Sequence, residues 1–295
     1  MSILLVGGNG QVGHELRRSL ATLGDVAVTT RTGQLDGSDA LACDLSQPGA
    51  LTNVVGQVAP DIVVNAAAYT AVDKAENESE LAFRINAGAV EELAKVCATR
   101  GIPLIHYSTD YVFDGLGERP YQPDDATSPL GVYGASKLAG EEAIRASGAK
   151  HLILRTAWVY GLHGHNFLKT MLRVGAERDE LRVVSDQIGS PTPAWLIADV
   201  TAKILKQGIG AGGVHHLVTA GQTSWQGFAE AIFDEAVAAR KLARKPVVHA
   251  IPTSDYSTPA RRPPWSVLDT GSVRQAYEVV LPDWREALRR TFVLE

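Results

Sequence analysis

The chain has 295 residues, of which 45% are hydrophobic, and a formal net charge of −5 at pH 7. This length and composition suffice for the core of an α/β protein with one or two domains. The negative charge and the lack of a Lys/Arg cluster argue against nucleic acid as a partner. Residues 2–6 are too few for the apolar core of a secretory signal, and no apolar run approaches bilayer length, so we expect a cytoplasmic protein without membrane contact.

The cysteines and histidines argue against a disulfide framework and against a metal site. Cys43 and Cys97 stand alone without CxxC spacing, so we expect buried, reduced thiols. The eight histidines show no metal-ligand spacing. His215 and His216 are adjacent and would point to opposite faces of a strand. No bound metal is therefore expected.

Strand and helix patterns alternate along the first half of the chain. Apolar strand candidates lie at 2–6, 25–30, 61–66, 102–108 and 151–156. Helical stretches separate them near 11–23, 47–58, 79–100 and 134–147. The alternation predicts an α/β fold with a doubly wound parallel sheet of the Rossmann type. Ligands of such sheets bind beyond the carboxyl ends of the strands, so the residues after each strand are the candidates for function.

The first strand end carries a glycine turn. Gly7, Gly10 and Gly13 follow the strand at 2–6, and a helical pattern begins at Gln11 and Val12. Such glycines allow a tight turn, a close approach to a pyrophosphate, and close packing of helix on strand, while the helix N-terminus offers free N–H groups. The spacing is Gly-x-x-Gly-x-x-Gly rather than Gly-x-Gly-x-x-Gly, and a simple tight turn is the alternative. The surrounding alternation favours a dinucleotide site.

The second strand end and the segment after it indicate how the adenosine end of a cofactor would bind. No carboxylate follows the strand at 25–30, where NAD-preferring proteins usually carry one, and Arg31 could instead accept a 2′-phosphate. This favours NADPH, with NADH also allowed, unless Arg31 is a solvated loop residue. Asp44 could hydrogen-bond the adenine while Leu45 covers its face, or Asp44 could cap a helix.

Small residues follow the strand at 61–66. Ala66, Ala67 and Ala68 precede Tyr69 and Thr70, and small side chains let a backbone lie against a flat ligand. Tight helix packing is the alternative explanation. We assign these five residues, and Tyr107 on a later strand, to the cofactor site.

Tyr133 and Lys137 lie four residues apart in a helix-forming stretch, so one helical turn places both on one face. A nearby ammonium favours the phenolate, so we expect Lys137 to lower the pKa of Tyr133. Thr109 ends a strand where its hydroxyl could reach the same pocket, and the three side chains would form a proton-transfer set. A solvated surface pair is the alternative for Tyr133 and Lys137.

Taken in order, the glycine turn, Thr109 and Tyr133-x-x-x-Lys137 resemble the extended short-chain dehydrogenases. Stretches over nearly the whole chain look like the dTDP-4-dehydrorhamnose reductases, namely 65–76, 107–115, 166–172, 186–192 and 259–263. The resemblance implies reduction of the C4 keto group of dTDP-4-dehydro-L-rhamnose by NAD(P)H, the last step of dTDP-L-rhamnose synthesis. It implies Tyr133 as proton donor, Lys137 as ligand of the nicotinamide ribose, and Thr109 as partner of the carbonyl oxygen.

The resemblance also divides the chain. It implies an NAD(P)-binding Rossmann domain at 1–160 and a smaller, mainly substrate-binding α/β part at 161–295, with segments such as 188–218 returning to the first domain. The expected substrate contacts follow from the same comparison. Asp110 and Tyr111 would line the sugar pocket, Trp158 would pack on the sugar or serve as a core aromatic, and Arg261 and Arg262 would bind the diphosphate or remain solvated.

Three other functions occur among proteins with a similar pattern of residues. The 4,6-dehydratases carry a glutamate where this chain has Tyr111, which argues against dehydration. Sugar-nucleotide epimerases use the same Tyr and Lys and stay open, as does a regulatory subunit without turnover. Some relatives hold magnesium at a dimer interface; Glu15 matches one of their ligands, but Trp195 stands where a second would be. A homodimer is allowed but would not be bridged by a metal.

Overall fold

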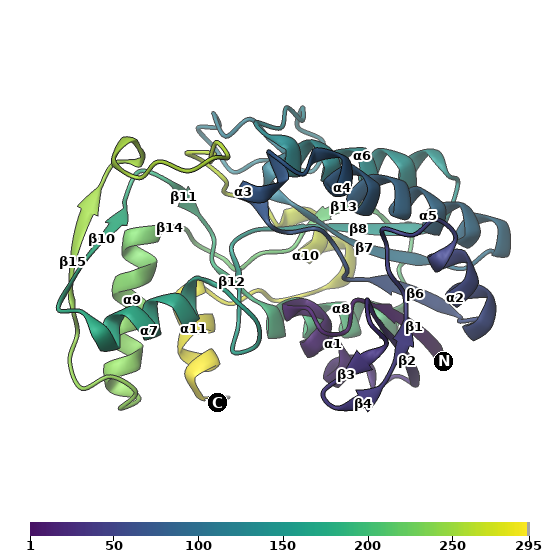
Figure 1. The fold of residues 1–295 in the computed structure, drawn as a ribbon, viewed down its shortest axis with the longest axis horizontal. Coiled ribbons are helices and arrows are strands. Elements are labelled where there is room, and N and C mark those ends of the chain that lie inside the picture. The colour runs from purple at the N-terminus through teal and green to yellow at the C-terminus, as the bar shows by residue number, and fades with distance from the viewer. Residues whose placement is uncertain (294–295) are drawn as a thin grey trace.

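The structure, a computed structural model, describes residues 1–293 (Figure 1). A parallel sheet of seven strands has the order β13-β8-β7-β6-β1-β2-β5. Its strands are β1 (Ser2–Val6), β2 (Asp25–Thr30), β5 (Leu41–Ala42), β6 (Ile62–Asn65), β7 (Leu104–Thr109), β8 (His151–Thr156) and β13 (Gly213–His216). The strand order reverses between β1 and β6, which confirms the doubly wound Rossmann-type sheet and locates its switch point.

Two strands of the sheet were not among the predicted ones. β5 has only two residues, and β13 has four, of which one is glycine and two are histidines, so neither presents an apolar run. The two histidines do point to opposite faces, as expected. His216 is fully buried and bonds the Asp269 carbonyl, whereas His215 bonds the Ser272 hydroxyl.

Helices cover both faces of the sheet. One face carries α1 (Gln11–Leu20), α8 (Ala194–Gln207) and α10 (Gly271–Tyr277), and the other carries α2 (Ala50–Val58), α5 (Ala89–Arg100) and α6 (Val132–Ala146). β1 shows why both are needed, since Ile3 and Leu5 join the first core and Leu4 and Val6 join the second. The predicted helix at 79–100 is continuous but contains a π-helical turn. It consists of α4 (Ser79–Phe83), the π-helix η1 (Arg84–Gly88) and α5, after the short α3 (Val72–Ala75).

A second group of elements stands at one end of the molecule, on the left in Figure 1. It contains the helices α7 (Phe167–Glu177), α9 (Trp225–Ala238) and α11 (Trp284–Val293), and the paired strands β10 (Glu180–Val184) and β15 (Val247–Ile251). These elements share a separate core that includes Leu168, Phe228 and Phe233. Between the two groups the chain crosses more than once, because α8 packs on α1 and β13 pairs with β8.

The remaining elements are short. Outside the large sheet lie β3 (Gln34–Leu35), β4 (Ser38–Asp39), β9 (Val159–Tyr160), β11 (Ile188–Gly189), β12 (Thr192–Pro193) and β14 (Thr223–Ser224). Two 3-10 turns, η2 (Asp110–Val112) and η3 (Thr253–Asp255), complete the described chain.

Cys43 and Cys97 are free and buried, as expected, and burial raises the pKa of the Cys43 thiol to about 11. None of the helices within residues 1–293 has the length and apolar character needed to cross a bilayer. The cytoplasmic location stays a prediction.

Candidate active site

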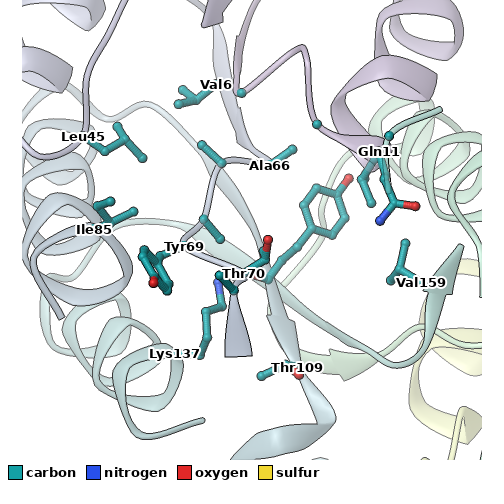
Figure 2. A pocket seen from close by; sticks show the side chains of 18 of the residues that line it. Val6, Gln11, Leu45, Ala66, Tyr69, Thr70, Ile85, Thr109, Lys137 and Val159 are labelled. Atoms are coloured by element: carbon teal, nitrogen blue, oxygen red, sulfur yellow. Dashed lines mark hydrogen bonds between the residues drawn. The ribbon is translucent and has the colours of Figure 1, made fainter. Parts of the chain in front are cut away.

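A pocket of about 840 Å³ opens at the carboxyl ends of the parallel strands, where the switch point predicts a ligand site (Figure 2). Most of the predicted site residues line it: Gly7, Gly10, Gln11, Val12, Arg31, Asp44, Leu45, Ala66, Ala67, Ala68, Tyr69, Thr70, Tyr107, Thr109, Asp110, Tyr111, Tyr133, Lys137 and Trp158. Gly13, Arg261 and Arg262 are not part of this lining.

The glycine turn packs against the alanine segment after β6. Gly7 has φ +85°, and a Cβ there would lie 2.7 Å from that of Ala67. At Gly13 a Cβ would lie 2.1 Å from the Gly7 carbonyl oxygen, so this glycine serves the packing of helix on strand. Helix α1 begins after Gly10 without a side-chain cap. The small alanines are thus explained partly by packing, and the uncapped helix end faces the pocket as an anion site would.

The adenosine side of the pocket contains Arg31 and Asp44. The backbone N–H of Ser46 donates to Asp44 Oδ1 at 3.0 Å, and this bond, then the Ser46 side chain and last the Arg31 charge, lower the pKa of Asp44. Helix α2 begins at Ala50 after Gly49, so the alternative that Asp44 caps a helix is wrong. Asp44 closes a local turn and leaves its carboxylate at the pocket.

Tyr133 is half-buried beside Thr109, and desolvation raises the pKa of its phenol. The neighbouring Thr109 hydroxyl lowers this pKa in part, while the charges of Asp110 and Tyr111 raise it. The expectation that Lys137 lowers the pKa is therefore wrong for this structure: the cost of burying a phenolate dominates.

Lys137 is directed at the backbone of β7. It is 2% exposed, and its Nζ donates to the Tyr107 carbonyl oxygen at 2.7 Å and lies 3.2 Å from His106 Nε2. Burial lowers the pKa of Lys137 to about 8, against a smaller opposing effect of Glu141. The Tyr107 phenol bonds Thr201 of α8 at 2.8 Å, so Tyr107 meets the site through its carbonyl rather than its ring.

Asp110 and Tyr111 border Tyr133. The Asp110 carboxylate accepts a bond from the Thr109 hydroxyl at 2.9 Å, and burial raises its pKa to about 7. Its Oδ2 has no hydrogen-bond partner within residues 1–293. The Tyr111 ring meets the Tyr133 ring edge-on, with centroids 5.5 Å apart. A polar ligand group would satisfy the unpaired carboxylate oxygen.

Of the remaining expected substrate residues, Trp158 lines the pocket, whereas Arg261 and Arg262 do not. Trp158 lines the pocket and stacks on Trp225 with ring centroids 3.6 Å apart. Arg262 pairs with Asp73 at 2.7 Å and donates to the Tyr111 hydroxyl at 3.3 Å, which links its loop to the pocket. Arg261 is exposed outside the pocket lining.

Several contributors carry no local sequence signal. Asp73 meets Arg262 across 189 residues, and Trp225 lies far along the chain from Trp158. Asn65 ends the otherwise apolar strand β6, and His106 directly follows the apolar start of β7; both strands are buried, and that contrast could have singled these two residues out. The Asn166 amide donates to Gln11 Oε1 at 2.8 Å and so fastens the start of α7 to the glycine turn.

The parallel sheet with its glycine turn, and the Thr, Tyr and Lys side chains at one pocket, are the features of a short-chain dehydrogenase/reductase. The chain belongs to the family described as the RmlD substrate binding domain, whose model matches residues 1–294.

Named relatives span almost the entire chain. The dTDP-4-dehydrorhamnose reductase of Escherichia coli is 48% identical over 98% of this chain and 96% of that protein. The protein of the same name from Salmonella typhimurium is 46% identical, with the same coverage. The crystal structure of a Bacillus anthracis dTDP-4-dehydrorhamnose reductase in complex with NADP has a TM-score of 0.90 and 33% identity, and covers 100% of this chain and 99% of that one.

Glu15 and Trp195, the positions that match metal ligands of some relatives, each lie beside an arginine. Glu15 pairs with Arg18 at 3.5 Å, and the Arg290 guanidinium lies 4.4 Å from the Trp195 ring centroid. Across the part of the chain that the structure describes, no group of three His, Cys, Asp or Glu residues could hold a metal ion. A homodimer without a bridging metal stays a prediction.

Proposed function

We propose that this chain reduces the C4 keto group of dTDP-4-dehydro-L-rhamnose to dTDP-L-rhamnose with NADPH. The observation that carries the proposal is the convergence of Thr109, Tyr133 and Lys137 on one pocket that the glycine turn also lines. The names of relatives that match nearly the whole chain support the same reaction.

The pocket fits a dinucleotide. A Cβ at Gly7 would collide with Ala67, so the glycine lets the turn pack closely on the alanine segment, and the uncapped start of α1 offers N–H groups to a pyrophosphate. Arg31 would hold the 2′-phosphate, and Asp44 with Leu45 would hold the adenine. Figure 2 shows Val6, Leu45 and Ile85 on one side of the pocket and Gln11 and Val159 on the other. When bound, NADPH supplies the hydride.

Tyr133 is suited to deliver the proton. Because burial raises its pKa, the phenol keeps its proton at neutral pH until an alkoxide forms nearby. The Thr109 hydroxyl lies beside the phenol and donates to Asp110 in this structure, and by turning it could donate to the carbonyl oxygen of a bound substrate. Lys137, charged below a pKa of about 8, would bind the nicotinamide ribose and can return a proton to the phenolate that remains.

We assign the sugar to Asp110, Tyr111 and Trp158, which border Tyr133 or line the same pocket. We assign the diphosphate to Arg262, assisted by Arg261, because the Asp73 carboxylate leaves part of the Arg262 guanidinium available. In this scheme residues 1–160 bind the cofactor, and 161–295 mainly bind substrate.

The proposal is tested by following the absorbance of NADPH while upstream enzymes generate the dTDP-4-keto sugar. We expect oxidation of NADPH in proportion to dTDP-L-rhamnose formed. Cofactor binding without oxidation would instead identify a regulatory subunit. Interconversion of sugar epimers without net NADPH consumption would identify an epimerase.

A further inference from the structure

Behind the catalytic lysine lies a row of buried polar groups that joins β6, β7 and α6. Asn65 ends β6, His106 lies next to it on β7, and Lys137 reaches them from α6. Asn65 and His106 are 1% and 0% exposed, and neither belongs to the pocket lining. They touch neither the pocket nor solvent, so any effect they have on the reaction passes through Lys137.

The orientation of the Asn65 amide is fixed by the chain itself. The backbone N–H of Ala67 donates to Asn65 Oδ1 at 3.1 Å, so the amide nitrogen faces His106 Nδ1, also at 3.1 Å. An amide nitrogen only donates, and Nδ1 must therefore accept. Burial and the charge of Lys137 keep the pKa of His106 well below its ordinary value, so the ring is neutral and carries its proton on Nε2.

This tautomer directs an N–H at the lysine. His106 Nε2 lies 3.2 Å from Lys137 Nζ, which already donates to the Tyr107 carbonyl at 2.7 Å. An ammonium has three donors and no acceptor, whereas a neutral amine has a lone pair that can accept the Nε2 proton. The geometry therefore favours the amine over the ammonium at this position.

We propose that His106 is a positioning residue for Lys137: held by Asn65 as the Nε2–H tautomer, it donates to the lysine nitrogen and stabilises the amine formed when the lysine gives up its proton. The inference rests on the proposed reductase function. After Tyr133 has protonated the alkoxide, a proton passes from the Lys137 ammonium to the phenolate oxygen, which restores the phenol and leaves the amine. The amine later regains a proton from water.

Other charges act on the same lysine. The titratable groups on the elements around it are Tyr133 and Glu141 of α6, His106 of β7, Asp110 just after β7, and Arg155 of β8, which is paired with Glu141. Apart from His106 itself, these groups are unchanged when only Asn65 or His106 is altered. The pH dependence of turnover therefore separates the effect of His106 from theirs.

The kinetic test uses His106→Gln and Asn65→Asp. Glutamine can offer a carbonyl oxygen to the ammonium, and an aspartate at 65 would draw the imidazole proton to Nδ1 and leave Nε2 as an acceptor. Both changes should shift the basic limb of the kcat profile upward by about one pH unit. His216→Gln, at another buried histidine, is the control and should leave the limb in place. A limb that stays or moves down in both variants, or that moves equally in the control, would overturn the proposal.

A second measurement needs neither turnover nor a folded variant. The ¹⁵N shifts of the His106 ring in the wild-type protein should show an unprotonated Nδ1 and a protonated Nε2. A protonated Nδ1 would overturn the proposal. If the ring shows the expected tautomer but the wild-type protein does not oxidise NADPH, the proposed function fails while the hydrogen-bond assignment stands.

Discussion

Helix α6 borders two buried cations whose surroundings differ. Arg155 and Lys137 are each 2% exposed. Arg155 donates to both carboxylate oxygens of Glu141, at 2.9 and 2.7 Å, and stacks over Phe113. Lys137 instead bonds a carbonyl and faces an imidazole.

The difference shows how one helix can serve both stability and chemistry. A guanidinium held by a bidentate carboxylate has its charge compensated and stays a fixed part of the fold. A buried ammonium without such a partner has its pKa lowered toward neutrality, here to about 8, and can exchange its proton. The pocket lies at Lys137 and not at Arg155.

The largest expected effect is that of Tyr133→Phe, which tests the chemistry assigned to the pocket at Lys137. Loss of the phenolic proton should lower kcat by roughly 10²–10⁴-fold while cofactor binding persists. Steady-state kinetics and a fluorescence titration with NADPH measure the two effects. Turnover near that of the wild type would remove Tyr133 from the mechanism.

The arginine end is tested by Glu141→Gln. This change leaves Arg155 buried without its counter-charge and should lower the free energy of unfolding by about 3–5 kcal/mol. Urea denaturation measures it. The matched control is the double variant Glu141→Leu with Arg155→Met, which should recover most of the loss. If the single variant is as stable as the wild type, the pair is not the compensated charge described here.

Because Lys137 titrates near neutral pH and an arginine does not, the free energy of unfolding should depend on pH through Lys137. Because its folded pKa is about 8 and its ordinary value 10.5, the unfolded chain binds more protons between these limits. The wild type should therefore gain up to about 3 kcal/mol relative to Lys137→Met as pH rises from 8 to 10.5. Denaturation of both proteins across this window measures the difference. A constant difference would show that the lysine is not titrating abnormally.

The smallest expected effect concerns Arg31, which is exposed at the pocket, unlike the two buried cations. Arg31→Ala should raise the KM for NADPH roughly tenfold, as expected for loss of one charge-assisted contact, and leave the KM for NADH unchanged. Parallel kinetics with the two cofactors decide it. Equal changes for both would place Arg31 away from the 2′-phosphate.

Short-range patterns predicted the first elements of the large parallel sheet well. β1, the glycine turn and α1 follow from consecutive residues, and Tyr133 and Lys137 follow from helical spacing. The prediction that failed there was the direction of a pKa shift, and not the position of a residue. The raised pKa of Tyr133 depends on burial by segments distant in sequence, which helical spacing does not reveal.

The surroundings of the expected substrate residues could not be predicted, because they are formed by contacts between segments that are distant in sequence. The pairing of Arg262 with Asp73 and the stacking of Trp158 on Trp225 follow only once the chain has folded. β13 was not among the predicted strand ranges because its sequence Gly-Val-His-His contains no apolar run. The resemblance to a family supplied the substrate, which spacing alone did not.

The central claim is that hydride reaches C4 of the sugar while Tyr133 supplies the proton. The most direct measurement is turnover with NADPH deuterated on the transferred position, followed by mass spectrometry and NMR of the sugar product. We predict one deuterium at C4 of dTDP-L-rhamnose with the wild-type protein and little product with Tyr133→Phe. A product without deuterium at C4, or undiminished labelling in the variant, would contradict the account.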